Sequence, residues 1–239
     1  MLAMPCKIIH YLATAEILRP VIHFDFDGTI VQTAPKYSLR NFRKYPLQPM
    51  PGFLDFFSGL HVEDDEGDPL IEIGSIISRR PNINQRRIVT RRSLQDCQLS
   101  GEFYDKYVCL QGSEEDKAKR VVADAATTKE KLGRVVGMIE AKPHKLGLEI
   151  VKHILGNGEV YEPIVIGVVN HPEAGSRIER LEKAVIAHFG GKVTVDHEND
   201  GAQFISHENG SFSLDVVQLG DYSEIAGSRF ANRLLDYTF

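Results

Sequence analysis

The chain has 239 residues, of which 42% are hydrophobic and 26% are charged, and its formal net charge is −5. These values are typical of a globular protein with one large domain or two small ones. The negative balance excludes a protein that binds nucleic acid through its bulk charge.

Cysteine usage and apolar run length indicate the compartment. The three cysteines, Cys6, Cys97 and Cys109, are widely spaced, which indicates neither a metal-binding pattern nor a disulfide framework and favours a reducing environment. No apolar run approaches the roughly 20 residues of a membrane-spanning helix. The N-terminal segment lacks the uninterrupted apolar core of a signal peptide. We therefore expect a cytoplasmic protein with no membrane partner.

The first half of the chain predicts strands separated by a helix and loops. Residues 21–26 form a mostly apolar run, as in a strand that is buried on both faces. The segment 51–60 starts with a proline and spaces its phenylalanines along one face of a helix. Two further apolar runs, 70–78 and 106–111, predict the next strands.

The second half alternates more clearly between helices and strands. Ser113, with an acid three residues later, predicts the start of a capped amphipathic helix. A strand over 134–141 precedes a helix that has Pro143 in its first turn and Gly156 as its stop. The run 163–169 predicts another strand, and a further helix follows it.

The order of these elements predicts the fold class. Alternation through residue 190 favours an α/β protein with a mostly parallel central sheet, built as a Rossmann-like three-layer α/β/α sandwich. The last 50 residues predict short strands and a closing helix near 222–237. We expect a single domain over 1–239, with a core at 21–190 and with 191–239 packed on it.

Two aspartates mark the end of the first predicted strand. Asp25 and Asp27 stand one residue apart in the string "VIHFDFDGT", and Gly28 follows them. Residues i and i+2 of a strand face the same side, so both carboxylates can converge on one site. Their repulsion calls for a cation, and Mg²⁺ prefers oxygen ligands. The alternative is structural, with Asp27 and Gly28 in a turn and Asp25 capping the next element.

The same string resembles the first motif of the haloacid dehalogenase (HAD) superfamily, an apolar strand followed by D-x-D-G-T. The resemblance implies a HAD-like fold and a Mg²⁺-dependent phosphomonoester hydrolase. Asp25 would be the nucleophile that forms an aspartyl-phosphate, and Asp27 the general acid and then the base. Gly28 and Thr29 would shape the substrate loop. The stretch from Thr29 to Gly52 is too short for the family's large cap.

The resemblance implies a second motif, a strand that ends in a serine or threonine that holds a phosphate oxygen. Ser78 ends the strand "IEIGSIIS", whereas its competitor Ser75 lies in mid-strand. Arg79 follows directly and is a candidate to bind the substrate phosphate. The alternative is that Ser78 caps the next helix.

The implied third motif is a lysine at the start of a helix, which would neutralise the phosphate and the nucleophile. Lys142, followed by Pro143, matches this pattern. The alternative is a solvated surface lysine. Other candidates for the role are Lys145, Lys117 and Lys119.

The implied fourth motif is a strand that ends in acidic metal ligands, and here the sequence departs from the family. The strand "PIVIGVV" carries Val168 where an acid is expected. Glu173 is a possible substitute, Asn170 offers a neutral oxygen, and Asp221 lies in a later Gly-Asp pair that also reads as a helix cap. The expected metal ligands are Asp25, Asp27 and Glu173.

Six arginines follow the second motif with no acid among them, at positions 79, 80, 86, 87, 91 and 92. They indicate either a basic patch near the phosphate site or a surface helix whose arginines pair with acidic neighbours, such as those of the loop 63–68. No aromatic residue is interleaved, so base stacking has no support. Among the histidines, His23 is expected inside the core, whereas His144 and His171 are candidates to line the site.

These patterns predict a phosphatase that acts on a small or macromolecular phosphate ester. Two alternatives stay open. One is a phosphate-binding or scaffold protein with little turnover, which Val168 suggests. The other is a phosphatase of nucleotides or nucleic-acid ends, which only the arginines suggest.

Overall fold

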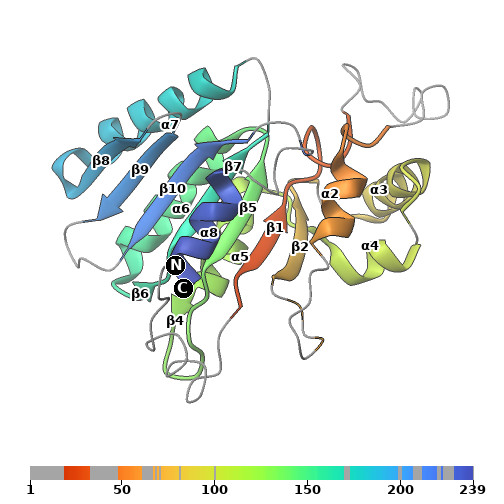
Figure 1. Cartoon of the computed structure of the whole chain (residues 1–239), viewed down its shortest axis with the longest axis horizontal. Helices are drawn as coiled ribbons and strands as arrows, with labels where there is room; N and C mark the ends of the chain where they lie inside the picture. Colours follow the sequence, from red (N-terminus) through yellow and green to blue (C-terminus); the bar gives the residue numbers. More distant parts are fainter. Residues whose placement is uncertain are drawn as a thin grey trace, which may run out of the picture.

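The computed structural model describes residues 19–32, 48–60, 67, 69, 71–80, 82–99, 101–169, 173–198, 201–206, 212–219, 222 and 229–238. An eight-stranded sheet crosses this part of the chain in the order β3-β2-β1-β5-β7-β10-β9-β8 (Figure 1). Its strands are β1 (Val21–Phe24), β2 (Glu72–Ser78), β3 (Val108–Leu110), β5 (Val136–Glu140), β7 (Ile164–Val168), β8 (Val193–Glu198), β9 (Gly201–Ser206) and β10 (Ser213–Gln218).

The sheet is parallel from β3 through β10, and only β9 and β8 are added antiparallel. The predicted α/β class with a mostly parallel central sheet is therefore confirmed. The C-terminal strands belong to the same sheet as β1, because β10 pairs directly with β7. A separate two-stranded ladder joins β4 (Ala126–Thr127) to β6 (Val160–Tyr161).

Helices cover both faces of the sheet and divide the core into two clusters. The helices are α2 (Phe53–Gly59), α3 (Asn84–Asp96), α4 (Gly101–Tyr107), α5 (Glu114–Ala125), α6 (Pro143–Asn157), α7 (Ala174–Phe189) and α8 (Arg229–Thr238). One cluster holds side chains of α5, α6 and α7, and the other holds those of α2, α3, α4 and α8. None of the described helices is long and apolar enough to cross a membrane.

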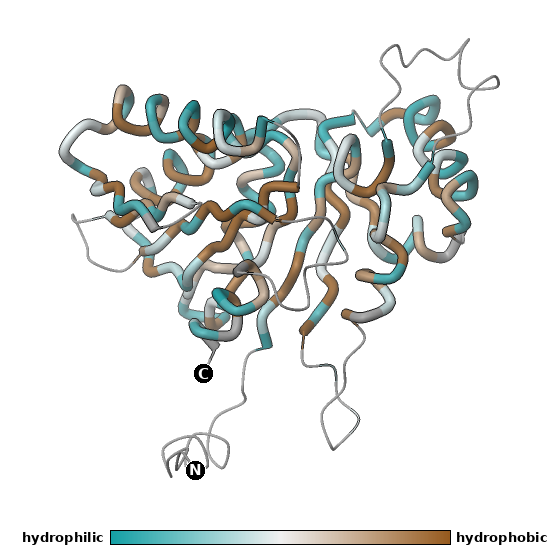
Figure 2. Tube along the Cα trace, turned by 45° about the horizontal axis from the view of Figure 1, so that its top comes forward, coloured by the Kyte–Doolittle hydropathy of each residue, from teal (hydrophilic) through white to brown (hydrophobic). Residues whose placement is uncertain are grey.

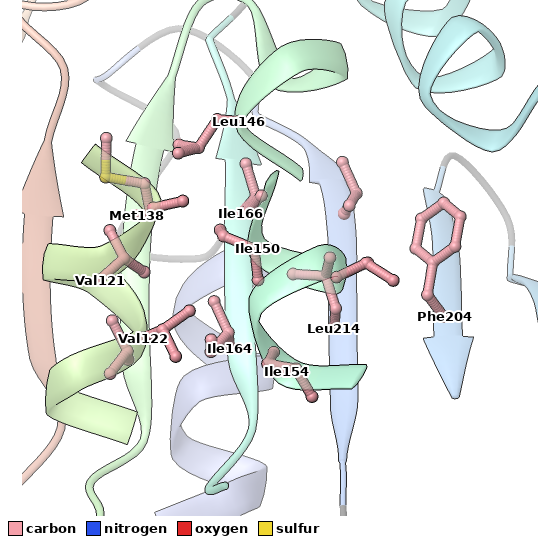
Figure 3. Close-up of a cluster of buried hydrophobic side chains, with 14 of the residues drawn as sticks. Val121, Val122, Met138, Leu146, Ile150, Ile154, Ile164, Ile166, Phe204 and Leu214 are labelled. Atoms are coloured by element: carbon pink, nitrogen blue, oxygen red, sulfur yellow. The ribbon is translucent and has the colours of Figure 1, made fainter. Parts of the chain in front are cut away.

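The first core cluster fills the space between β5, β7 and β10 on one side and α5 and α6 on the other. Figure 3 shows Val121 of α5 and Ile150 of α6 directed at Met138 and Ile166 of the sheet. These side chains are essentially inaccessible to water. The trace in Figure 2 is accordingly most hydrophobic along the central strands. Strands that are buried on both faces read as continuous apolar runs, which is why the sequence revealed them.

The helix α8 covers the opposite face, over the middle of the sheet (Figure 1). A Cβ atom on Gly137 would lie 2.9 Å from the Phe230 ring, and one on Gly167 would lie 2.9 Å from the same ring. The two glycines therefore let α8 approach β5 and β7. The helix is also held by the buried Asp215 of β10, which accepts hydrogen bonds from the Tyr237 hydroxyl at 2.8 Å and from the Arg233 guanidinium.

Helix ends follow the predicted local rules with one correction. Ser113 caps α5, because its Oγ accepts the backbone N–H of Asp116 at 3.0 Å. Gly156 was expected to stop α6 but lies inside it. The helix ends at Asn157, and Gly158 adopts the left-handed conformation with a φ of 62°. Only a residue that tolerates positive φ closes a helix in this way, and the chain offers two glycines for the task.

The packing of α8 predicts the effect of a paired set of glycine substitutions. Gly167→Ala should lower the free energy of unfolding by about 1–3 kcal/mol, because its methyl group would overlap Phe230 and Leu219. Gly156→Ala is the control, since a Cβ there meets nothing within 4 Å and should stabilise α6 by about 0.5–1 kcal/mol. Urea unfolding followed by circular dichroism measures both, and equal stability of Gly167→Ala and the wild type would contradict the described contact.

Candidate functional site

The carboxyl ends of the parallel strands bring the predicted site residues to one edge of the sheet. Asp25 follows β1, and its backbone N–H donates to the carbonyl of Ile139 in β5 at 2.8 Å. Ser78 ends β2, and Glu140 ends β5. Ligands of such sheets bind at this edge, so the position agrees with the expected location of a site.

The centre of this edge is a lysine held between two buried carboxylates. The Lys117 ammonium on α5 donates to Asp25 Oδ1 at 2.7 Å and also to Glu140 Oε2. All three side chains are buried. Hydrogen bonds between opposite charges away from water are strong, and an unpaired charge in this position would be costly. We call Asp25, Lys117 and Glu140 the charge cluster.

The charge cluster carries one negative charge in excess, and the pKa values reflect this. Burial raises the pKa of the Asp25 carboxyl to about 7, repulsion from Glu140 acts in the same direction, and the Lys117 ammonium opposes both. Burial acts to lower the pKa of Lys117, but the carboxylates of Asp25 and Glu140 outweigh it and raise that pKa above its usual range. Lys117 therefore stays positively charged, whereas the Asp25 carboxyl gains or loses its proton near neutral pH.

The second aspartate has its own cation. Arg80 donates to both oxygens of Asp27, from Nη2 to Oδ1 at 2.6 Å and from Nε to Oδ2 at 2.9 Å. The third guanidinium nitrogen, Nη1, donates to Thr90 Oγ1 of α3 at 2.9 Å, and the guanidinium lies 4.6 Å from the centre of the Phe26 ring. This bidentate contact fixes the orientation of the Asp27 carboxylate plane.

The loop after the aspartates is closed by a tight turn. Gly28 has a φ of 80°, which favours glycine, and its N–H donates to the carbonyl of Val31 at 2.9 Å. Thr29 is fully buried, and its carbonyl accepts the Tyr222 hydroxyl at 2.9 Å. Thr29 therefore fixes the loop from inside and presents no side chain to a substrate in this conformation.

Ser78 and Arg79 lie at the same edge with different exposure. Ser78 is buried, and its Oγ accepts the backbone N–H of Arg80 at 3.2 Å, so it stabilises the turn after β2. Arg79 is exposed and pairs through Nε with Glu114 Oε1 at 3.0 Å. Burial raises the pKa of Glu114, whose other oxygen has no hydrogen-bond partner among the described residues. Glu114 is a site residue that the sequence did not single out.

The lysine that contacts Asp25 is Lys117, not Lys142. Lys142 stands just before α6 with an exposed side chain, and its backbone N–H donates to Glu140 Oε1 at 2.9 Å. Lys117 was only a secondary candidate because it lies inside the predicted helix after Ser113 rather than at a helix start. Lys142 and Pro143 mark the start of α6. Only the backbone N–H of Lys142 contacts the charge cluster, through Glu140.

The acid that was expected at the end of β7 is found at the end of β5, the strand next to β1. In the sheet, β5 lies between β1 and β7, and Glu140 pairs in register with Val168. Glu140 therefore supplies the carboxylate beside Asp25, while Val168 is buried in the core. The signal was the acid that closes "VGMIE", but strand neighbours cannot be read from chain order.

Glu173 lies beyond β7 and at the start of α7. Its carboxylate lies 3.7 Å from the Arg177 guanidinium, which also donates to the carbonyl of Ala141. The structure gives Glu173 no contact with Asp25, so its role as a metal ligand stays a prediction. Asn170, His171 and Asp221 lie outside the described residues. His23 is buried as predicted, with Nδ1 bound to the N–H of Ser75 and Nε2 to Asp124.

The donor chemistry of the charge cluster suits a hard cation, although no group of three His, Cys, Asp or Glu side chains within the described ranges is arranged to hold a metal. Mg²⁺ is commonly bound by one or two carboxylates, with waters and substrate phosphate completing the shell. Asp25 and Glu140 form such a pair, and their excess negative charge would be relieved by a divalent ion.

Replacing the shared lysine tests the charge cluster. Lys117→Met should lower the free energy of unfolding by about 3–5 kcal/mol, because it leaves two buried carboxylates without a counter-ion. Lys142→Met is the matched control and should stay within about 0.5 kcal/mol of the wild type, since its side chain is exposed. Urea unfolding at pH 8 in the presence of a chelator measures both, and a larger loss for Lys142→Met would reverse the assignment.

The raised pKa of Asp25 predicts that Asp25→Asn changes the free energy of unfolding by an amount that depends on pH. With a folded pKa of about 7 against an ordinary 3.8, the folded state binds the proton more tightly, so stability falls as pH rises through this window. Asp25→Asn removes that loss and leaves one carboxylate against one ammonium. We expect its stabilising effect to be about 1–3 kcal/mol larger at pH 8 than at pH 4. Thermal unfolding with chelator checks this, and a pH-independent difference would refute it.

Comparison with known proteins assigns no family to the chain. No protein-family model matches it, and neither a curated protein nor a solved structure matches it. The chemistry of the site therefore has to be inferred from its own side chains and from the sheet edge that carries them.

Proposed function

We propose that the protein is a HAD-type phosphomonoester hydrolase that uses Mg²⁺ and forms an aspartyl-phosphate on Asp25. The observation that carries the proposal is the charge cluster. The first aspartate of the D-F-D-G-T string is buried against a lysine, and an acid from the neighbouring strand lies beside them. These are the residue types that the resemblance to the HAD superfamily implies, in the roles of nucleophile, phosphate-binding lysine and metal ligand. A cytoplasmic location is part of the proposal.

In the first step, a carboxylate oxygen of Asp25 attacks the phosphorus of the ester. The new Asp25–phosphate bond forms as the bond to the leaving oxygen breaks. The leaving oxygen takes a proton from Asp27, which has first received that proton from the monoanionic form of the phosphate ester. In the second step, water attacks the same phosphorus, Asp27 takes its proton, and the bond to Asp25 breaks to release inorganic phosphate. Dividing the hydrolysis into two transfers is covalent catalysis.

The residues around the aspartates have defined tasks in this scheme. Lys117 keeps its positive charge and stabilises the charge that gathers on the phosphoryl oxygens. Arg80 donates a hydrogen bond to each oxygen of Asp27 and so orients its carboxyl group. For Asp27 to donate a proton, Arg80 has to release one of its oxygens, and the phosphate of an arriving substrate offers Arg80 an alternative anion. Mg²⁺, held by Asp25 and Glu140, would offset phosphate charge when bound.

A phosphatase assay tests the proposal. Purified protein with Mg²⁺ should hydrolyse a panel of phosphomonoesters, Asp25→Asn should abolish turnover, and Asp27→Asn should lower kcat by about 10²–10⁴-fold. Mass spectrometry of acid-quenched protein should locate phosphate on the peptide that contains Asp25. Equal turnover by wild type and Asp25→Asn would remove the nucleophile and the proposal with it.

Magnesium dependence distinguishes the two candidate acids in the same assay. Glu140→Gln should raise the Mg²⁺ concentration needed for half-maximal activity by about 10–100-fold, whereas Glu173→Gln is the control and should leave it unchanged. A shift for Glu173 alone would return the ligand role to the residue that the sequence indicated.

A second candidate function is a phosphate-binding protein with little turnover. The observation that favours it is the engagement of both Asp27 oxygens by Arg80, which leaves neither oxygen of Asp27 free to serve the leaving group. Calorimetric binding of inorganic phosphate together with no hydrolysis of any ester would select this function.

A further inference from the structure

We propose that the exposed face of α3 binds the phosphodiester backbone of a nucleic-acid strand, and that a phosphorylated end of that strand is the substrate of the neighbouring site. The binding surface consists of Arg86, Arg87, Arg91 and Arg92. The substrate assignment rests on the proposed phosphatase function, whereas the binding surface stands on its own observations.

The first observation is the local charge. The chain carries a net charge of −5, yet residues 73–95 contain six arginines and no acid. Two of these arginines, Arg79 and Arg80, are engaged at the site by Glu114 and Asp27. The other four lie on α3 with exposed side chains, while Val89 and Leu94 bury the opposite side of the helix. A concentrated basic face on an acidic protein is the electrostatic footprint of a polyanion site.

The second observation is that these arginines have few acidic partners among the residues that the structure describes. Arg91 pairs with the exposed Asp105 at 2.8 Å, and Arg87 donates to the neutral amide of Asn82 at 2.6 Å. Arg86 and Arg92 form no ion pair with any residue that the structure describes. The expectation that acidic neighbours neutralise the arginines therefore holds for Arg91 within the described part of α3.

The third observation is that the charges oppose the stability of the helix. Arg86 and Arg87 stand near its N-terminus and Asp96 at its C-terminus, which is the reverse of what the helix dipole favours. Arg87 and Arg91 are four residues apart on the helix, so their like charges repel each other. Ile83 supplies no side-chain cap. Stability does not explain this arrangement, whereas binding an anion does.

Helix α3 is also tied to the site. The Arg80 guanidinium bonds Asp27 and Thr90 together, so the middle of α3 is fixed to the second aspartate. Residues 84–92 rise about 12 Å along the helix, so this face is long enough to contact more than one phosphate of a nucleic-acid strand. A strand whose terminal phosphate reaches Asp25 can therefore lay its next phosphates on α3.

A nucleic acid fits this face better than a lipid surface does. Besides its arginines, α3 and its entrance expose two isoleucines, Ile83 and Ile88, and no aromatic residue. An interfacial helix needs a continuous apolar face to enter a bilayer, and that face is lacking here. Because α3 itself carries no aromatic side chain for stacking, its contacts go to phosphates and carry no base preference, and the nearest described ring is Tyr104 of α4, 5.7 Å from the Arg91 guanidinium.

Fluorescence anisotropy tests the surface independently of turnover. The probe is a labelled single strand of about 12 nucleotides with a terminal phosphate, bound to Asp25→Asn protein so that it is not hydrolysed. Introducing Arg87→Gln and Arg92→Gln should weaken binding about tenfold at low salt. It should also reduce the slope of log affinity against log salt by about 1.4, or about 0.7 for each lost contact. The matched control replaces Arg180 and Lys183 of α7, both exposed, and should bind as the parent does.

The outcomes separate the two proposals. Equal losses in both double variants, or no binding at about 50 mM salt, would overturn the nucleic-acid surface, and so would binding of phosphatidylserine vesicles without binding of the oligonucleotide. In otherwise wild-type protein, the two arginine substitutions should lower the ratio of kcat/KM for the phosphorylated oligonucleotide to kcat/KM for an aryl phosphate about tenfold. Specific binding without hydrolysis of either ester would keep the surface and remove the phosphatase.

Discussion

The ammonium group of Lys117 lies between the carboxylates of Asp25 and Glu140, and the site depends on this contact. Removing the lysine would leave two buried carboxylates that neither water nor protein compensates. The contact joins α5 to the ends of β1 and β5. The site residues are therefore placed correctly only when α5 is packed in the first core cluster. The excess negative charge that remains favours a cation, and a bound cation would in turn attract the substrate phosphate.

The two aspartates are held by helices from different core clusters. Asp25 is bound by Lys117 of α5, whose apolar residues belong to the first cluster. Asp27 is bound by Arg80, which is tied to α3, and α3 contributes Leu94 to the second cluster. Because Asp25 and Asp27 are two positions apart, helices on opposite faces of the sheet can each hold one of the two carboxylates. A shift of either layer would change the separation of the two carboxylates.

Local sequence patterns predicted the strands, the Ser113 cap and the placement of Asp25 at a strand end, because each depends on neighbours in the chain. Lys117 and Glu140 were not chosen because their roles depend on strand order. β5 lies next to β1, whereas the more regular strand β7 lies one position further away. Gly156 and Gly158 show the same limit, since either glycine could end α6 and only the folded backbone shows which adopts positive φ.

The contact of α8 with Gly137 and Gly167 has a consequence for biosynthesis. The two central strands lack side chains at these points, and Phe230 fills the space. Until the ribosome has released residues 229–238, the hollow in the middle of the sheet stays open to water and to other nascent chains. The face of the sheet at Gly137 can therefore be covered only by a helix that is translated about 90 residues later. A molecular chaperone that shields this hollow would act on the chain during that interval.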